Sequence, residues 1–240
     1  MTVGSYAIIA AAVLLASCMQ ASIGFGMGML AAPIVAIVEP SLIPATLIML
    51  ATMVTLLVVV REHQAIDVAG TGWALAGRIP GTVAGALMLA ALPERALAIL
   101  LASVVLLGVV LTSTGWAPVP GRRNLVVAGA ASGVLGTATS IGGPPMALVW
   151  QGVTGARLRG TMNGFFLIGS VLSVAVLALT GEVGMHTFRY FGMLLPACIA
   201  GYVLSRLVNR VLDHSRQRRL AIAVSAVGAV ALIARQVIGF

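Results

Sequence analysis

The sequence predicts an all-α polytopic membrane protein with about eight hydrophobic helical elements in two repeats of four. Composition is the first reason, because 60% of the 240 residues are hydrophobic, only 8% are charged, and the mean hydropathy is +1.10. No soluble domain needs so much apolar surface. Secondly, the charges gather in short clusters between apolar runs of roughly 17 to 25 residues, the length of a helix that crosses a bilayer. Thirdly, a glycine-rich interruption of an apolar run occurs once in each half.

The basic residues mark the ends of the apolar runs. All 14 of them are arginine, and the net charge is +8. In a soluble chain this charge would suggest nucleic acid, but beside apolar runs it indicates topology and headgroup contact, so we expect the lipid bilayer and no nucleic acid as a partner. Cys18 and Cys198 lie inside apolar runs, without Cys or His at metal-binding spacing, and we interpret them as small core residues.

The first half, residues 1–120, contains four elements. The first runs from about Ser5 to Val38, too long for one straight span, and its centre is the glycine-rich sequence Q-A-S-I-G-F-G-M-G from Gln20 to Gly28. Three further apolar runs follow, each stopped by charged or proline residues, and they cover Leu42–Val60, Trp73–Leu92 and Ala96–Thr112. Trp73 is placed as an interfacial aromatic residue.

The second half, residues 121–240, repeats this order after a linker rich in glycine and proline, Ser113–Asn124. Its first element runs from Leu125 to about Val153 and is interrupted by T-S-I-G-G-P-P from Thr139 to Pro145. Three apolar runs follow, at Gly160–Thr180, Phe188–Val208 and Leu220–Ile238.

Short motifs recur in the same order in both halves. Ser-Ile-Gly begins at Ser22 and Ser140, an offset of 118 residues (140 − 22). A Pro-x-x-x-Ala-Gly frame begins at Pro80 and Pro196, an offset of 116 (196 − 80). Leu-Ala-Ile begins at positions 97 and 220, an offset of 123 (220 − 97). Small residues recur by chance in membrane helices, so the shared order, and no single match, indicates a duplication.

The arginines bear on how the two interrupted elements lie. If both cross the membrane, the arginines other than Arg78 divide eight to five between the two faces. If both dip in and return, they divide ten to three, with the three at Arg95, Arg189 and Arg235. The positive-inside rule favours the second arrangement. Each half then makes three crossings, and the halves form an inverted repeat, as in many transporters.

The two interruptions are the candidate binding site. Unpaired backbone in hydrocarbon costs several kcal/mol, so such a break must face protein or a water-filled cavity. Helix N-termini that follow a break attract anions. The candidate residues beside the breaks are Gln20, Ser22, Gly24, Gly26, Gly28, Thr137, Thr139, Ser140, Gly142, Gly143 and Pro144, with Asn163 in the next element of the second half. The alternative is tight helix packing by the small residues and hydrogen bonds from the hydroxyls to carbonyls of their own helix.

Arg78 is the one arginine well inside an apolar run, about 7 to 8 Å along the helix from Trp73. It could extend its guanidinium to the interface. A structural ion pair with Glu62 or Asp67 is the interpretation we favour, and attraction of an anionic substrate is the alternative that adds Arg78 to the candidate site.

Histidines and carboxylates do not suggest a metal, a cofactor or a proton relay. The three histidines, His63, His186 and His214, lie in loops without metal-ligand spacing. All six acidic residues fall near predicted helix ends. An anion leaving a cell that is negative inside is driven outward by about 2.3 kcal/mol per charge per 100 mV, so export needs no coupling ion. Import would need one, and backbone carbonyls at the breaks could hold Na⁺.

These features together resemble a known family. The run G-F-G-M-G-M-L-A-A-P from Gly24 to Pro33, the run S-I-G-G-P-P from Ser140 to Pro145 and the eight-segment duplication are similar to the sulfite exporter TauE/SafE family, over nearly the whole chain. The resemblance implies a permease of the bacterial plasma membrane that moves small organosulfur or other anions, often outward. Because substrates in the family are diverse, it implies an anion transporter more strongly than a sulfite transporter.

The expected function is therefore a multi-pass membrane transporter, and not an enzyme, for a small anion such as sulfite or a sulfonate, with alternating access to a site between the two breaks. The sequence leaves open whether the protein forms a homodimer. The rival from another class is an intramembrane serine protease built on Ser132 and His186, but Ser132 lacks the glycine two residues before it that such proteases show, and His186 lies at a span end. A non-catalytic scaffold is a third reading, disfavoured by the small loops.

Overall fold

The computed structural model describes residues 2–113 and 118–211, and every regular element in these residues is helical. The α-helices are α1 (Val3–Ile23), α2 (Met27–Val38), α3 (Ala45–Glu62), α4 (Val68–Ala91), α5 (Glu94–Ser113), α6 (Arg122–Thr139), α7 (Gly143–Val149), α8 (Gly155–Leu179) and α9 (Met185–Val211), with short 3₁₀ turns η1 (Pro40–Leu42) and η2 (His63–Ala65). The seven predicted elements that fall in these residues, and both interruptions, are confirmed. Arg122 and Arg123, predicted in the linker, form the first turn of α6. The eighth element, Leu220–Ile238, and His214 lie outside the described residues.

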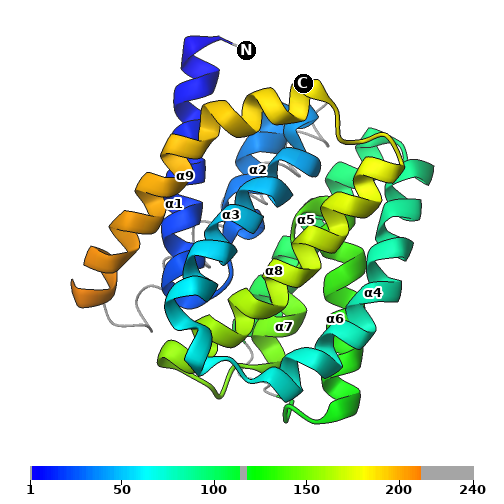
Figure 1. Cartoon of the computed structure of the whole chain (residues 1–240). Helices are drawn as coiled ribbons and strands as arrows, with labels where there is room; N and C mark the ends of the chain where they lie inside the picture. The colour runs from blue at the N-terminus through cyan, green and yellow to red at the C-terminus, as the bar shows by residue number, and fades with distance from the viewer. Residues whose placement is uncertain (1, 114–117, 212–240) are drawn as a thin grey trace.

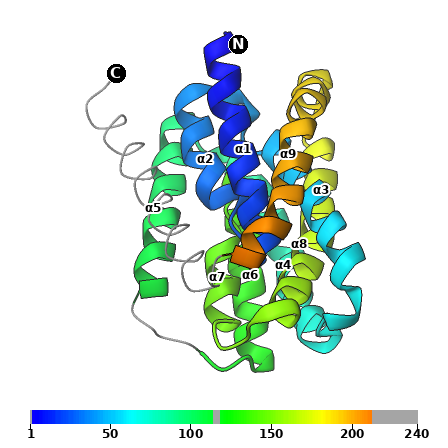
Figure 2. The same cartoon turned by 90° about the vertical axis from the view of Figure 1, so that its left-hand side faces the viewer.

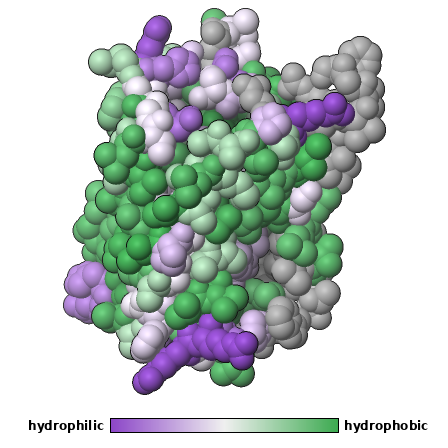
Figure 3. Space-filling model, turned by 90° about the vertical axis from the view of Figure 1, so that its right-hand side faces the viewer, coloured by the Kyte–Doolittle hydropathy of each residue, from purple (hydrophilic) through white to green (hydrophobic). Residues whose placement is uncertain are grey.

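The surface polarity of the helices is that of a protein in lipid. On α4 the large apolar side chains of Ile79, Val83 and Leu87 are 55%, 47% and 65% exposed, whereas the polar Arg78 and Thr82 are buried. Figure 3 shows the same pattern on the surface, with an apolar band between two polar ends. Among the described residues, five helices (α1, α3 with η2, α4, α8 and α9) are long and apolar enough to cross a membrane.

Three helix pairs make the main packing layers, namely α4 with α6, α1 with α9, and α3 with α8 (Figure 1). The α4–α6 pair is close because glycines line both faces. A methyl group at Gly77 or Gly81 of α4 would overlap backbone of α6, and one at Gly129 of α6 would overlap backbone of α4. Such close backbone approach is a usual way for helices to associate in lipid, where no hydrophobic driving force holds them together.

The interrupted elements double back on themselves. At the start of α6, the Arg122 guanidinium lies 5.1 Å from the Trp73 ring, near the beginning of α4. Gly85, about three turns further along α4, packs against Val134 of α6. Trp150, directly after α7, packs against Gly70, back at the beginning of α4. The second interrupted element therefore runs along α4 as α6 and comes back as α7. The first does the same, since α1 and α2 are adjacent and α2 runs back toward the N-terminal end of α1 (Figures 1 and 2).

Candidate functional site

The first break, between α1 and α2, is closed by the side chain of Gln20. The chain turns through Gly24 (φ 95°) and Gly26 (φ 129°), conformations that residues with a Cβ rarely adopt. The Gln20 amide oxygen accepts a hydrogen bond from the Met27 N–H at 3.1 Å, and its nitrogen approaches the Gly24 carbonyl oxygen at 3.4 Å. One buried amide thus pairs both a donor and an acceptor that the interrupted helix leaves free.

The N-terminus of α2 keeps backbone donors for a ligand. Its first intrahelical hydrogen bond runs from the Leu30 N–H to the Gly26 carbonyl, at 3.0 Å. The N–H groups of Gly28 and Met29 precede that bond and so have no acceptor within the helix. The positive end of the helix dipole lies at the same place, so this terminus suits an anion.

The second break, between α6 and α7, is built differently. Ser140 takes a left-handed conformation (φ 64°), and its hydroxyl donates to the Pro44 carbonyl at the start of α3, at 3.1 Å. The seven-residue helix α7 begins with Gly143, Pro144 and Pro145. Because the two prolines have no N–H, this terminus offers fewer amide donors than the sequence analysis assumed for both breaks.

The two breaks meet inside the bundle. A methyl group at Gly28 would overlap the carbonyl oxygen of Ser140, and one at Gly143 would lie 3.5 Å from Phe25. A cavity of about 50 Å³ lies between them and is lined from both sides. Helices α3, α4 and α8 complete its walls through Ile48, Ala51, Arg78, Phe166 and Ser170.

Arg78 brings a positive charge to this cavity. The residue is 3% exposed and its Nη1 donates to the Ser132 hydroxyl at 2.8 Å, while its Nε has no hydrogen-bond partner among the described residues. The predicted ion pair is wrong, because Glu62 binds Arg61 and Arg159, and Asp67 binds Arg157. A buried charge without a counter-ion is costly, so this guanidinium favours a bound anion.

The surroundings of Arg78 hold its guanidinium inward rather than toward the interface. It lies over the rings of Phe165 and Phe166, 5.0 and 5.7 Å from their centroids. A methyl group at Gly169 of α8 would overlap it, so the absence of a side chain there makes its space. Ser132 in turn donates its hydroxyl to the Gly142 carbonyl at 2.7 Å, which ties Arg78 to the second break.

Comparison with known families agrees with this architecture. The family described as sulfite exporter TauE/SafE matches residues 9–232, almost the full chain. The chain belongs to the TauE/SafE family. This is a family of membrane transporters, so the TauE/SafE chain is a multi-pass membrane protein whose family indicates an anionic sulfur substrate. No curated protein and no solved structure matches the chain.

The structure places the thirteen predicted site residues of this TauE/SafE protein in two groups. Seven line the cavity: Gln20, Gly26, Gly28, Arg78, Ser140, Gly142 and Gly143. Six lie beside it without lining it: Ser22, Gly24, Thr137, Thr139, Pro144 and Asn163. Thr139 bonds the Leu135 carbonyl of its own helix at 2.7 Å, the alternative considered for the hydroxyls, and Thr137 bonds Ser173 at 2.8 Å.

Several cavity residues were not identified from the sequence. Those with side chains at the cavity are Phe25, Met27, Met29, Ile48, Ala51, Ile141, Phe166 and Ser170. Ser132 was weighed only as a protease nucleophile. A usable signal existed in the helical spacing, because Ser132, Gly136 and Ser140 follow each other at i, i+4 and i+8 and so share one face of α6.

The contacts of Ser132 do not favour the protease reading. Its hydroxyl hydrogen goes to the Gly142 carbonyl, and its oxygen accepts from Arg78, so no base holds it as a nucleophile. His186 instead stacks with Tyr190 at the start of α9, with ring centroids 4.5 Å apart.

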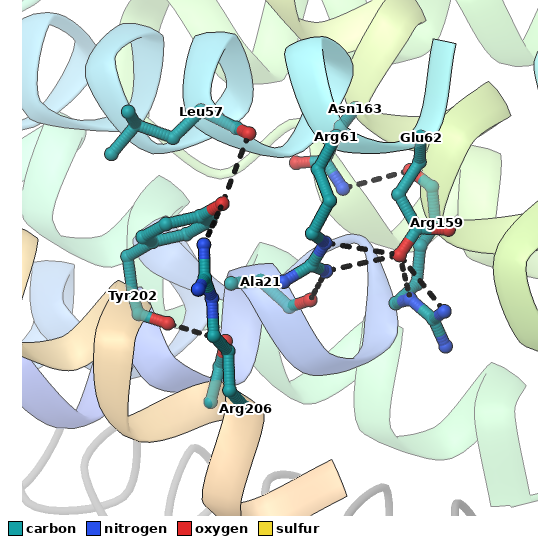
Figure 4. Close-up of polar contacts among 9 residues, drawn as sticks. Ala21, Leu57, Arg61, Glu62, Arg159, Asn163, Tyr202 and Arg206 are labelled. Carbon is teal, nitrogen blue, oxygen red and sulfur yellow. Dashed lines mark hydrogen bonds and ion pairs between the residues drawn. The ribbon is translucent and has the colours of Figure 1, made fainter. Parts of the chain in front are cut away.

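A polar network extends from Gln20, which lines the cavity, to the ends of α1, α3 and α8; Figure 4 shows its part from Asn163 to Arg61. Gln20 donates to Asn163 Oδ1 at 3.3 Å, and Asn163 donates to the Arg159 carbonyl at 2.8 Å. Arg159 binds Glu62, Glu62 binds Arg61, and Arg61 reaches the Ala21 carbonyl at 3.5 Å. Asn163 therefore connects the first break to an ion cluster.

Proposed function

We propose that this TauE/SafE protein carries a small organosulfur or other oxyanion across the plasma membrane, in the outward direction, through the cavity between its two broken elements. The observation that carries the proposal is Arg78, a buried cation beside the cavity with an unpartnered Nε and no carboxylate bound to it among the described residues.

The donors around the cavity suit an oxyanion. A guanidinium gives directed, charge-assisted hydrogen bonds to oxygen. Gly28 and Met29 also line the cavity, and their N–H groups, at the start of α2, add neutral donors. In the part of the chain that the structure describes, no aspartate or glutamate lines the cavity. A volume of about 50 Å³ holds a few waters or a small polyatomic ion, so an anion with a carbon chain needs the walls to move apart.

The outward direction follows from charge. The membrane potential drives an anion out of the cell by about 2.3 kcal/mol per charge per 100 mV. A carrier that only exposes its site alternately to the two sides therefore exports an anion without a coupling ion.

Helix pairing supports two inverted repeats, residues 1–120 and 121–240, as the basis of alternating access. The third element of each half packs on the broken element of the other half, since α4 packs on α6 and α9 packs on α1. The second elements, α3 and α8, pack on each other. A two-fold axis in the membrane plane predicts that each half packs its third element on the broken element of the other half. Many transporters have this arrangement.

The arginines of the described residues support an orientation. Arg61 and Arg159 both bind Glu62. Arg157 binds Asp67, which is five residues after Glu62. Arg122 stacks on Trp73, near the start of α4. These four arginines therefore gather at one end of the bundle, and the positive-inside rule places that end in the cytoplasm.

Efflux from proteoliposomes tests the function. Purified protein is reconstituted with internal sulfite, sulfate, thiosulfate or a sulfonate, and release is measured with and without a potential set by K⁺ and valinomycin. We expect potential-dependent release of at least one of these anions. Arg78→Gln should lower the rate about ten-fold or more, because a hydrogen bond to a charged group contributes about 1.5–3 kcal/mol.

Two controls separate a site effect from a folding effect. Arg157→Gln removes an arginine whose side chain is 66% exposed and should keep the original rate. Arg78→Lys keeps the charge and should retain part of the flux. Release that ignores the potential, or that is equally fast in Arg78→Gln at equal protein content, contradicts the proposal.

A further inference from the structure

The ion cluster at the ends of α3 and α8 contains two arginines that share one carboxylate. Arg61 approaches Glu62 Oε1 with Nη2 at 3.0 Å and Nε at 3.2 Å, and Arg159 approaches the same oxygen with Nη2 at 2.9 Å and Nε at 3.0 Å. Two guanidinium forks thus converge on a single oxygen position (Figure 4). Two cations and one anion leave this cluster with a net charge of +1.

The cluster is set into the bundle, unlike the other ion pair at this end. The side chains of Arg61, Arg159 and Glu62 are 26%, 21% and 9% exposed, whereas Arg157, the partner of Asp67, is 66% exposed. The nearly buried Glu62 carboxylate is costly to leave without its two arginines. The two arginines, in turn, are costly to hold together without an anion between them. The Arg157 pair, by contrast, is open to solvent screening.

The cluster lies beside the end of α1, close to the first break. Arg61 donates to the Ala21 carbonyl in the last turn of α1, beside the first break, and its guanidinium lies 5.5 Å from the Tyr202 ring of α9. The backbone carbonyl of Arg159 is joined through Asn163 to Gln20, which lines the cavity. The cluster therefore belongs to α3 and α8, contacts α1 and α9, and is separated from the cavity by Asn163 and Gln20.

We propose that Arg61 and Arg159 form a second binding site for a small oxyanion, at the arginine-rich mouth of the bundle, and that the Glu62 carboxylate occupies this site when no solute anion does. An anion that moves between the mouth and the cavity displaces Glu62 and is then handed toward Arg78. The converging forks match an oxyanion, which presents the same acceptor oxygens as the carboxylate. The inference rests on the proposed function for the identity of the ligand, but not for the existence of the site.

The test removes the internal anion and offers an external one. In Glu62→Gln the two guanidiniums lose their counter-ion, so the purified full-length protein should unfold at a lower temperature than the original. Sodium sulfate, titrated against gluconate at constant ionic strength, should raise the Tm of Glu62→Gln by clearly more than that of the original protein. The double variant Glu62→Gln with Arg159→Gln should lose this extra response.

Two control variants test whether the sulfate-dependent rise in Tm comes from the site formed by Arg61 and Arg159. Arg157→Gln should respond to sulfate as the original protein does. Glu62→Gln combined with Arg78→Gln should keep the extra response, since the mouth does not need the cavity site. Failure of anion efflux with an intact sulfate response would overturn the proposed function alone, and a sulfate response no larger than that of the original protein would overturn the second site.

Two further arms complete the design. An acidic phospholipid in the detergent micelle, in place of sulfate, should not restore Tm; if it alone does, the site binds a lipid headgroup and the proposal fails. Should Glu62→Gln not fold, Arg159→Gln is assayed by efflux instead. Its apparent KM should rise several-fold when anion is supplied on the mouth side, with Arg157→Gln unchanged, and an equal KM contradicts the second site.

Discussion

The two breaks carry the same Ser-Ile-Gly tripeptide and yet contribute different chemistry. The first, after α1, presents the free N–H groups of Gly28 and Met29 at the positive end of a 12-residue helix. The second, after α6, starts its helix with Pro144 and Pro145, which have no N–H, and has the charged side chain of Arg78 beside it instead. The comparison teaches that two similar backbone interruptions can offer different donors, because the donors come from residues that differ between them.

The breaks also differ in what holds them. The first is closed locally, since Gln20 bonds Met27 and Gly24 within eight residues of itself. The second has local bonds too, from the Ile141 N–H to the Thr139 hydroxyl and from the Ser132 hydroxyl to the Gly142 carbonyl, but its Ser140 hydroxyl also bonds the Pro44 carbonyl at the start of α3. Mutations should therefore act on the first break as local defects and on the second partly through its contact with α3.

The largest effect is expected where the breaks touch. In Gly28→Ala the new methyl group meets the Ser140 backbone, which cannot rotate away, so we expect a loss near the upper end of the usual overpacking cost of about 1–3 kcal/mol, together with loss of efflux. Thermal unfolding in detergent and proteoliposome efflux measure the two effects.

The matched control for this change is Gly143→Ala on the opposite break. Its methyl group would lie 3.5 Å from Phe25, an ordinary contact, so stability should change little. Equal destabilisation by the two alanines would show that the closest approach of the breaks is not at Gly28.

The next effect concerns how each break is closed. Gln20→Leu leaves the buried Met27 N–H and Gly24 carbonyl without the amide, at a cost of about 1–3 kcal/mol. Thr139→Val at the second break removes the bond to the Leu135 carbonyl and the bond from the Ile141 N–H, but it should cost less, because the Leu135 carbonyl is within a helix and only the Ile141 N–H loses its acceptor. Thermal unfolding of the two variants side by side measures the difference, and a larger loss from Thr139→Val would reverse the assignment of the local closure.

A smaller effect is expected at the residue that positions Arg78. Ser132→Ala removes one hydrogen bond to the guanidinium and one to Gly142, so we expect efflux about ten-fold slower, from a loss of about 1.5 kcal/mol. Ser205→Ala on α9 removes a buried hydroxyl that bonds only its own helix, and its rate should not change. Matching rates in the two variants would argue against a positioning role for Ser132.

The smallest effect is expected for Ser140→Gly. Glycine relieves a left-handed conformation worth roughly 1–2 kcal/mol but gives up the bond to Pro44, so the two changes nearly cancel in thermal unfolding. Gly24→Ala at the first break has no such compensation, because its methyl group would lie 3.0 Å from Met162 at a φ of 95°. A marked loss of stability in Ser140→Gly would show that the Pro44 bond, and not the backbone, dominates that turn.

Local sequence was enough for the helices and their interruptions. Hydropathy gave the spans, and Gly24, Gly26 and Pro144 mark where a membrane helix cannot continue. Seven of the thirteen candidate residues line the cavity; six of them belong to these interruptions and the seventh, Arg78, lies on α4. Among the residues that were missed, Phe166 and Ser170 lie on α8, and nothing in their own neighbourhood indicates which face of that helix meets the breaks.

Arg78 shows most clearly what could not be predicted from the sequence. Proximity in the chain suggested an ion pair with Glu62 or Asp67, but those carboxylates bind Arg61, Arg159 and Arg157, which come from α3 and α8. Charge pairing depends on distance in space, and α8 is about a hundred residues away from Glu62.

The sequence by itself determined that this is a membrane protein of interrupted helices, because the cost of unpaired backbone and of charge in lipid acts residue by residue. Only the tertiary structure decided that the two interruptions touch, that Arg78 turns inward between α6 and α8, and that Glu62 holds two arginines beside the end of α1. Those outcomes depend on which helices pack together, and packing is set by contacts between residues that the chain order keeps far apart.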